Sequence, residues 1–234
     1  MLKFEFPDVT PKSLLCDFEL GPILAVQEVF PNTEIKGCFY HLSHNLHKHL
    51  KSLGMSRSYN NDPEFALKTK MILALCFVPV ADMDMYVDAL SEFLPDDLQE
   101  LLNWFEDSYI GRLNRNRRGR RPPPFPMDTW NLYQRTISQE DKTNNHAEAA
   151  HRRIYAELQM HHPTIWRFID GIKRVQRGRD ANYEHFIAGN SPPQKLKKYL
   201  RADERIRRIV SNYDNDGREP LEYLRGIAHN FELN

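Results

Sequence analysis

The sequence has few of the features that mark secreted or membrane proteins. Its 234 residues include only three cysteines, Cys16, Cys38 and Cys76, which are too few and too scattered for a disulfide framework and favour a reducing compartment. The longest apolar run, Met71 to Val80, is far too short to span a bilayer. The first thirteen residues carry charges and two prolines, unlike a secretory signal. We therefore expect an intracellular protein with no membrane partner.

Net charge is also lacking, because 32 Lys and Arg balance 32 Asp and Glu. The balance is uneven along the chain. Residues 1–111 contain 8 basic and 17 acidic residues, whereas residues 112–234 contain 24 and 15. The second part is basic enough to face a polyanion. Hydrophobic residues make up 41% of the chain, which is enough for one core or two small ones.

The basic residues are densest just before a run of prolines, Pro122 to Pro126. Prolines favour extended backbone and remove hydrogen-bond donors, so this segment is predicted to be a loop that presents arginines. A solvated loop and a loop that contacts nucleic-acid phosphates are both open. The candidate DNA-binding residues are Arg115, Arg117, Arg118, Arg120 and Arg121 in this loop, and Lys173, Arg174 and Arg177 in a later helix.

Hydrophobic periodicity predicts a mostly helical chain with one or two short strands. One strand is expected to end at Asp17 and another to run from Glu34 to Phe39. Asp62 can cap a helix that has Pro63 at its first position, and Asp96 with Gln99 resembles a capping box. Further helices are expected at Leu42 to Leu53, after Asp82, after Thr143 or Asn144, after Pro163, at Pro192 to Asn212 and at Leu221 to Phe231.

Cys38 and His41 have the spacing of a metal-binding pair. A structural zinc site usually needs four ligands, and no second pair of this kind follows, so zinc is not expected. His41 and His44 lie one helical turn apart, which leaves a weak metal site as the alternative to a structural or DNA-proximal role. The three tryptophans, Trp104, Trp130 and Trp166, have apolar neighbours and are interpreted as core anchors rather than platforms for stacked bases.

An ordered set of short motifs resembles the transposase domain of Mutator-like elements. Each motif is weak alone, but they follow the family's order over roughly residues 10–175. The motifs are Asp17-Phe18-Glu19, Phe30-Pro31, Gly37-Cys38 with His41, Phe77-Val78-Pro79, Tyr109-Ile110-Gly111, Trp130-Asn131, Thr143-Asn144-Asn145 with Glu148, His151-Arg152, and His162-Pro163 with Trp166.

The resemblance implies a fold and a set of site residues. The family has an RNase H-like core with an Asp, Asp, Glu triad, in which Asp17 matches the second Asp and Glu148 the Glu; both would be catalytic and would bind Mg²⁺ or Mn²⁺. Cys38 and His41 match the family's Cys-x-x-His motif. Residues 1–175 would form a partial catalytic domain, with a helical insertion at 62–111 and the Arg/Pro-rich loop at 112–127, and residues 176–234 a basic helical extension.

Two departures from the family pattern affect the expected function. No strand carrying the first Asp is visible, because Asp8 lies between Pro7 and Pro11, and Ala149-Ala150 replace a Gly-Trp-like pair. We therefore expect an incomplete RNase H-like core, in a predominantly α-helical α/β chain. Without the resemblance, the favoured interpretation of Asp17 is a helix cap for the segment that follows, and Glu148 could be an ordinary surface acid paired with Arg152.

Three functions follow from these observations. The first is a truncated transposase fragment, nuclear or otherwise intracellular, that binds DNA and is catalytically defective alone. The second is an active metal-dependent transposase or nuclease whose first Asp comes from an upstream segment or a second transposase chain. The third is a domesticated protein-interaction module that uses the helical block. Strand cleavage of this kind needs two metal ions about 4 Å apart, so a missing bridging Asp predicts negligible catalysis.

Overall fold

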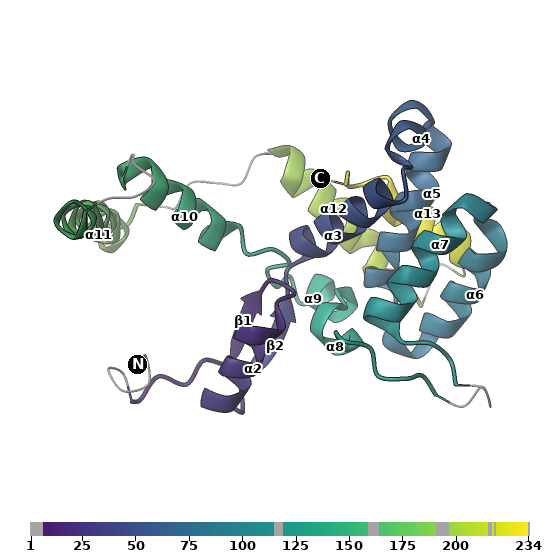
Figure 1. The fold of residues 1–234 in the computed structure, drawn as a ribbon, viewed down its shortest axis with the longest axis horizontal. Coiled ribbons are helices and arrows are strands. Elements are labelled where there is room, and N and C mark those ends of the chain that lie inside the picture. The colour runs from purple at the N-terminus through teal and green to yellow at the C-terminus, as the bar shows by residue number, and fades with distance from the viewer. Residues whose placement is uncertain are drawn as a thin grey trace. The chain divides into compact units, whose positions relative to one another are not determined.

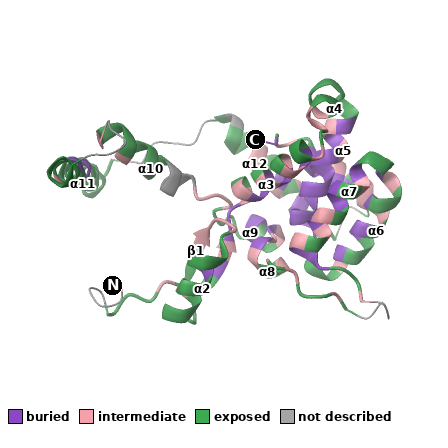
Figure 2. Cartoon of the chain, viewed as in Figure 1, coloured by how far each residue is buried: buried purple, intermediate pink, exposed green. Residues whose placement is uncertain are grey.

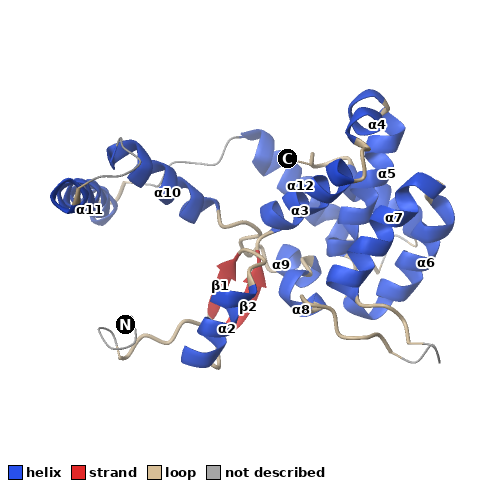
Figure 3. Cartoon of the chain, viewed as in Figure 1, coloured by secondary structure: helices blue, strands red, loops and turns tan. Residues whose placement is uncertain are grey.

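Helices dominate the protein (Figure 3). The computed structural model describes residues 7–114, 119–158, 164–190, 197–214, 217 and 219–233, with the side chains of 145–148 and 198 left out. Within these residues one sheet is present, made of two short parallel strands. The predicted helical character and the predicted pair of strands are therefore confirmed, whereas an RNase H-like core stays a prediction.

The chain forms two compact units. The larger unit comprises residues 1–143 and 200–234, and the smaller unit comprises residues 144–199. The predicted domain boundary at residue 175 is based on the family resemblance and not on compactness, and it stays a prediction. Helix α11, Ile165–Ile187, continues through that position without a break.

The strands belong to a strand–helix–strand segment at the start of the larger unit (Figure 1). Strand β1 is Ser13–Cys16, helix α2 is Leu20–Val29 and strand β2 is Glu34–Gly37. Ser13 pairs with Glu34 and Cys16 with Gly37, so the strands are parallel and end at the same edge. Ile23 is the buried residue of α2. Asp17 and Cys38, two residues of the predicted site, directly follow the two strands.

A helical block follows the strands and contains most of the core. Asp62 accepts hydrogen bonds from the backbone of Glu64 and Phe65, which confirms the predicted cap ahead of Pro63. The helices of the block are α3 (Phe39–Ser52), α4 (Ser56–Asn61), α5 (Pro63–Ala74), α6 (Met83–Phe93), α7 (Asp96–Phe105), α8 (Met127–Trp130) and α9 (Tyr133–Ile137). Two 3₁₀ turns, Leu75–Phe77 and Val80–Asp82, and a π-helical turn, Glu106–Ile110, complete it.

The predicted capping box at Asp96 and Gln99 is wrong. Pro95 precedes the helix and no side chain caps α7. Gln99 instead donates to the carbonyl oxygens of Ser91 and Leu94, at 2.7 and 3.0 Å. These two carbonyls lie at the C-terminal end of α6, where the last carbonyls of a helix have no intrahelical donor. The Gln99 side chain therefore links the end of α6 to α7.

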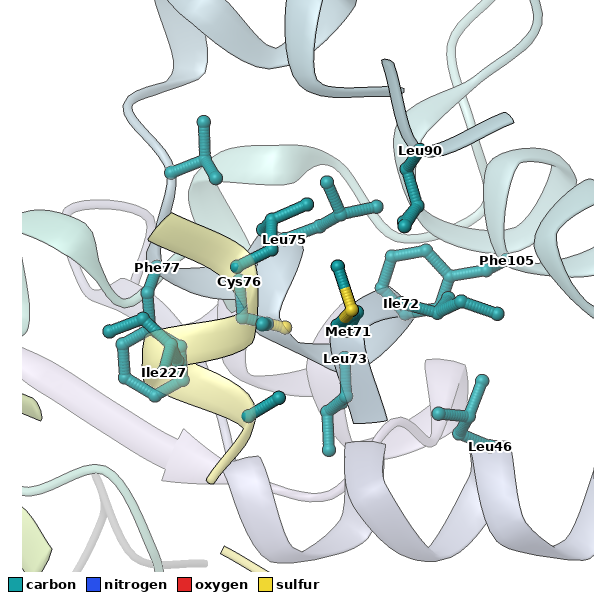
Figure 4. Packing of buried hydrophobic residues seen from close by; sticks show 14 of the residues in the cluster. Leu46, Met71, Ile72, Leu73, Leu75, Cys76, Phe77, Leu90, Phe105 and Ile227 are labelled. Carbon is teal, nitrogen blue, oxygen red and sulfur yellow. The ribbon is translucent and has the colours of Figure 1, made fainter. Parts of the chain in front are cut away.

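The last two helices return to the same core. They are α12 (Lys197–Ser211), which begins in the smaller unit, and α13 (Pro220–Ala228). Figure 1 shows α13 beside α5, and Figure 4 shows Ile227 among the buried side chains around Cys76 and Phe77. The buried Tyr223 hydroxyl donates to the carbonyl oxygen of Phe77 at 2.6 Å. The C-terminal helices are thus part of the larger unit's core.

The smaller unit is built on two helices, α10 (Asn145–Leu158) and α11. They pack where α11 has a glycine, because a side chain at Gly171 would overlap Leu158 of α10. Thr164 caps α11 by accepting a hydrogen bond from the Arg167 backbone. Pro163, the predicted start of this helix, lies outside the described residues.

Candidate functional site

Asp17 and His41 meet at the shared end of the two strands. Asp17 directly follows β1, and His41 lies in the first turn of α3, which begins just after β2. One Asp17 carboxylate oxygen, Oδ1, lies 3.0 Å from Nδ1 of His41. In open α/β sheets, ligands bind beyond the carboxyl ends of parallel strands. The structure therefore brings two residues of the predicted site together at the strand end where such sheets bind ligands.

Cys38 forms the joint between the strands and α3. Its backbone N–H donates to the carbonyl oxygen of Cys16 at 2.9 Å, which extends the β1–β2 pairing by one residue. Its side chain is completely buried and forms no disulfide. The structural or DNA-proximal role that the sequence favoured for Cys38 over metal binding stays a prediction. A buried thiol is a weak hydrogen-bonding group that packs as a small hydrophobe.

Arg135, a buried residue of α9 that the sequence did not single out, holds this joint in place. Its guanidinium donates to the carbonyl oxygens of Gly37 at 3.0 Å and Asp141 at 2.6 Å. The Phe39 N–H also donates to the Lys142 carbonyl at 2.8 Å, which satisfies a donor at the start of α3. The segment before α10 is thus tied to the β2–α3 joint by contacts within the larger unit.

Burial governs the electrostatics around this joint. Desolvation lowers the pKa of Arg135, although Glu140, Cys38 and other neighbours oppose the shift. Desolvation, with the nearby Asp17 charge, raises the pKa of Cys16, and burial raises the pKa of Cys76 well above its ordinary value. A raised thiol pKa disfavours the reactive thiolate. Cys16 and Cys76 therefore do not have the environment of nucleophiles.

Glu148, the second predicted carboxylate, is only partly covered by the structure. Its backbone lies in the first turn of α10, in the smaller unit, and its side chain lies outside the described residues. Its convergence with Asp17 stays a prediction. Among the described side chains, no three His, Cys, Asp or Glu residues gather as a metal site would require.

One residue of the arginine loop, Arg120, forms ion pairs within the protein. Arg120 is 9% exposed and pairs with Asp84 at 2.6 Å and Glu106 at 3.0 Å. Gly111 has φ 87° and lies so close to the Arg121 carbonyl that a side chain would overlap it. Arg121 is exposed, whereas Arg115, Arg117 and Arg118 lie outside the described residues. Arg120 thus has acidic partners within the protein, and DNA contact by this loop stays a prediction.

The remaining candidate DNA-binding residues lie on α11. Lys173, Arg174 and Arg177 are all exposed. Trp166, on the same helix, is 75% exposed, so the interpretation of Trp166 as a core anchor is wrong. Trp130 is buried and donates from Nε1 to the Tyr109 carbonyl at 2.9 Å, which confirms it as a core anchor. Trp104 is half-buried and stacks on His49.

Arg135 was missed because nothing in its neighbourhood in the sequence signals a buried cation. Its carbonyl partners include Gly37, 98 positions away.

Among the described residues, no helix is both long and apolar enough to cross a membrane. Comparisons of the chain with protein-family models, with curated proteins and with solved structures found no match.

Proposed function

We propose that this chain is a fragment of a Mutator-like transposase domain that binds DNA and does not cleave it alone. The observation that supports the proposal is the 3.0 Å pair between Asp17 and His41. It joins the acid after the first strand to the Cys-x-x-His motif after the second, two motifs that the resemblance treats as parts of one domain. The RNase H-like description of the sheet belongs to the same proposal.

The donor set explains why catalysis is not expected from this chain. Hard oxygen ligands suit Mg²⁺ and Mn²⁺, and Asp17, whose side chain is 40% exposed, can supply one such ligand. Glu148 would be the second. A two-metal centre needs carboxylates that hold both ions, and the described side chains form no group of three or more His, Cys, Asp or Glu that could hold an ion. The residues in hand therefore fit part of such a centre.

DNA binding is proposed for the exposed cations of α11. Residues 144–199 contain 10 Lys and Arg against 5 Asp and Glu. Phosphate contacts supply most non-specific affinity and make it strongly salt-dependent, with about 0.9 units of slope per neutralised phosphate on duplex DNA. We expect Lys173, Arg174 and Arg177 to contribute such contacts. DNA is therefore the proposed partner, and a nuclear location would follow from it.

The cleavage test uses the purified chain with supercoiled plasmid and Mg²⁺ or Mn²⁺. The expected result is no nicking or joining above background. Metal-dependent cleavage that disappears in both Asp17→Ala and Glu148→Ala would overturn the defective-fragment proposal. It would instead favour an active enzyme whose first carboxylate comes from another segment or chain.

The binding test titrates a labelled random duplex at two salt concentrations. The test variant replaces Lys173, Arg174 and Arg177 with Gln, and the matched control replaces three exposed cations of the larger unit, Lys48, Lys51 and Arg57, with Gln. Both variants lose three charges. We expect weaker binding and a salt slope lower by about 2 to 3 in the test variant alone. Equal loss in both variants would show that net charge, and not α11, determines the affinity.

A further inference from the structure

Strongly exposed aromatic side chains are concentrated in the smaller unit. Seven large aromatic residues of the described chain are exposed, and six of them lie within residues 144–199. Figure 2 colours most of α10 and α11 as exposed. The six residues are Tyr155, Trp166, Phe168, Tyr183, Phe186 and Tyr199. Large exposed apolar side chains that recur within one unit of a soluble protein are candidates for a binding role.

The same unit is the more basic one. It carries twice as many Lys and Arg as Asp and Glu, and on α10 Arg152 and Arg153 are exposed beside Tyr155. An apolar surface that docks another protein is depleted of charge at its centre. Aromatic rings interspersed with cations are instead the combination that binds unpaired nucleic acid, because rings stack on bases while cations contact phosphates.

The geometry of α11 places one ring and two cations on a single side. With 3.6 residues per turn, Trp166, Lys173 and Arg177 fall within about 40° of one another around the helix axis. Gly171 and Val175, the buried residues of α11, lie on the opposite side. The same geometry places three acids of α11, Asp170, Asp180 and Glu184, on or beside this side of the helix, with Lys173 and Arg177 on it and Arg174 at its edge. The stripe is thus turned away from the packing with α10.

We propose that the outer stripe of α11 binds single-stranded DNA, with Trp166 stacking on a base and Lys173 and Arg177 contacting the phosphates that flank it. The inference rests on the proposed DNA-binding function and narrows its substrate to unpaired strands. Trp166 is the residue that would give the preference for single strands, since cations alone bind duplex and single-stranded DNA alike. Duplex bases are already stacked on each other and offer no free face to a ring.

The experiment measures the affinity of the full chain for three labelled probes: oligothymidylate, an abasic oligonucleotide of the same length, and a duplex. We expect oligothymidylate to bind tighter than the abasic probe and Trp166→Leu to weaken it about tenfold, as loss of one stacked base does. Trp166→Phe should retain most of the affinity because it keeps a ring. Oligothymidylate should also quench tryptophan fluorescence, and Trp166→Leu should abolish the quenching, because Trp130 is buried and Trp104 is half-buried and stacked on His49 in the larger unit.

Ile187→Ala is the matched control, since Ile187 is a large, exposed aliphatic residue of the same helix. It should leave all three affinities unchanged. Equal binding of the abasic probe, or unchanged oligothymidylate binding by Trp166→Leu, would overturn the stacking inference while duplex binding still supported the proposed function. A change in oligomeric state in Trp166→Leu and Ile187→Ala, without a change in DNA affinity, would assign the surface to a second copy of the chain. Absence of binding to every probe would overturn both proposals.

Discussion

At the scale of single residues, Arg135 is the side chain on which the strand-end site most depends. It is buried, and its guanidinium reaches two main-chain carbonyls, those of Gly37 and Asp141. A buried cation is tolerated only when its donors find acceptors. Gly37 immediately precedes Cys38, so the same contacts hold the start of α3 and, with it, His41 opposite Asp17.

We expect Arg135→Gln to lower the free energy of unfolding by about 2 to 4 kcal/mol, because two buried carbonyls lose a charged donor. The free energy of unfolding of Arg135→Lys should lie between those of the parent and of Arg135→Gln. The ammonium group keeps the charge but lacks the planar fork that reaches both acceptors. Urea denaturation measures the change. Arg121→Gln, at an exposed position, is the control and should stay within about 0.5 kcal/mol of the parent. Similar losses at both positions would contradict the assigned role of Arg135.

At the scale of elements, the contact between α10 and α11 depends on a glycine. A Cβ at Gly171 would overlap Cδ2 of Leu158, whereas nothing lies within 4 Å of a Cβ at Gly178, two turns further along α11. The two glycines share one helix and differ in packing alone. Their comparison therefore separates helix propensity from the contact between helices.

We expect Gly171→Val to destabilise the helix pair by about 1 to 3 kcal/mol through overpacking. Hydrogen exchange of the α11 amides from Ile172 to Val175 should become faster in this variant. Gly178→Val makes the same change of propensity without the overlap, and it should leave that exchange unchanged or slower. Faster exchange in Gly178→Val would mean that the valine side chain, and not the loss of packing on α10, causes the effect.

At the scale of the whole molecule, the larger unit is assembled from two separated stretches of chain. Lys142 Nζ lies 3.2 Å from Asp203 Oδ1, so the chain leaves this unit and re-enters it at neighbouring points. The C-terminal stretch contributes fully buried residues, among them Leu224 and Ile227, and the buried Tyr223. The core is therefore complete only when both stretches are present.

We expect the larger unit to fold after residues 144–199 are replaced by a short Gly/Ser linker. Its Tm should change by no more than about 4 °C, the equivalent of ~1 kcal/mol for a domain of this size. Deletion of residues 200–234 should instead abolish cooperative thermal unfolding, because it exposes the core around Phe77. Circular dichroism melting compares the two forms. An excised form that does not fold would show that the smaller unit is needed for the larger one.

The sequence by itself determined the features that depend on neighbours along the chain. The two short strands, observed as Ser13–Cys16 and Glu34–Gly37, the Asp62 cap and the helical block follow from local hydrophobic periodicity and capping chemistry. Trp130 could be assigned to the core in the same way. Such features can be predicted because buried residues recur at about every 3.6 positions in a helix and every second position in a strand.

Only the tertiary structure decided which of several similar residues are buried or paired. Trp166 has apolar neighbours as Trp130 does, yet it is exposed, and Arg120 belongs to the same arginine run as Arg121, yet Asp84 and Glu106 bind it. Arg135 and Tyr223 find their partners 98 and 146 positions away. These outcomes depend on contacts between distant segments, which local periodicity does not encode.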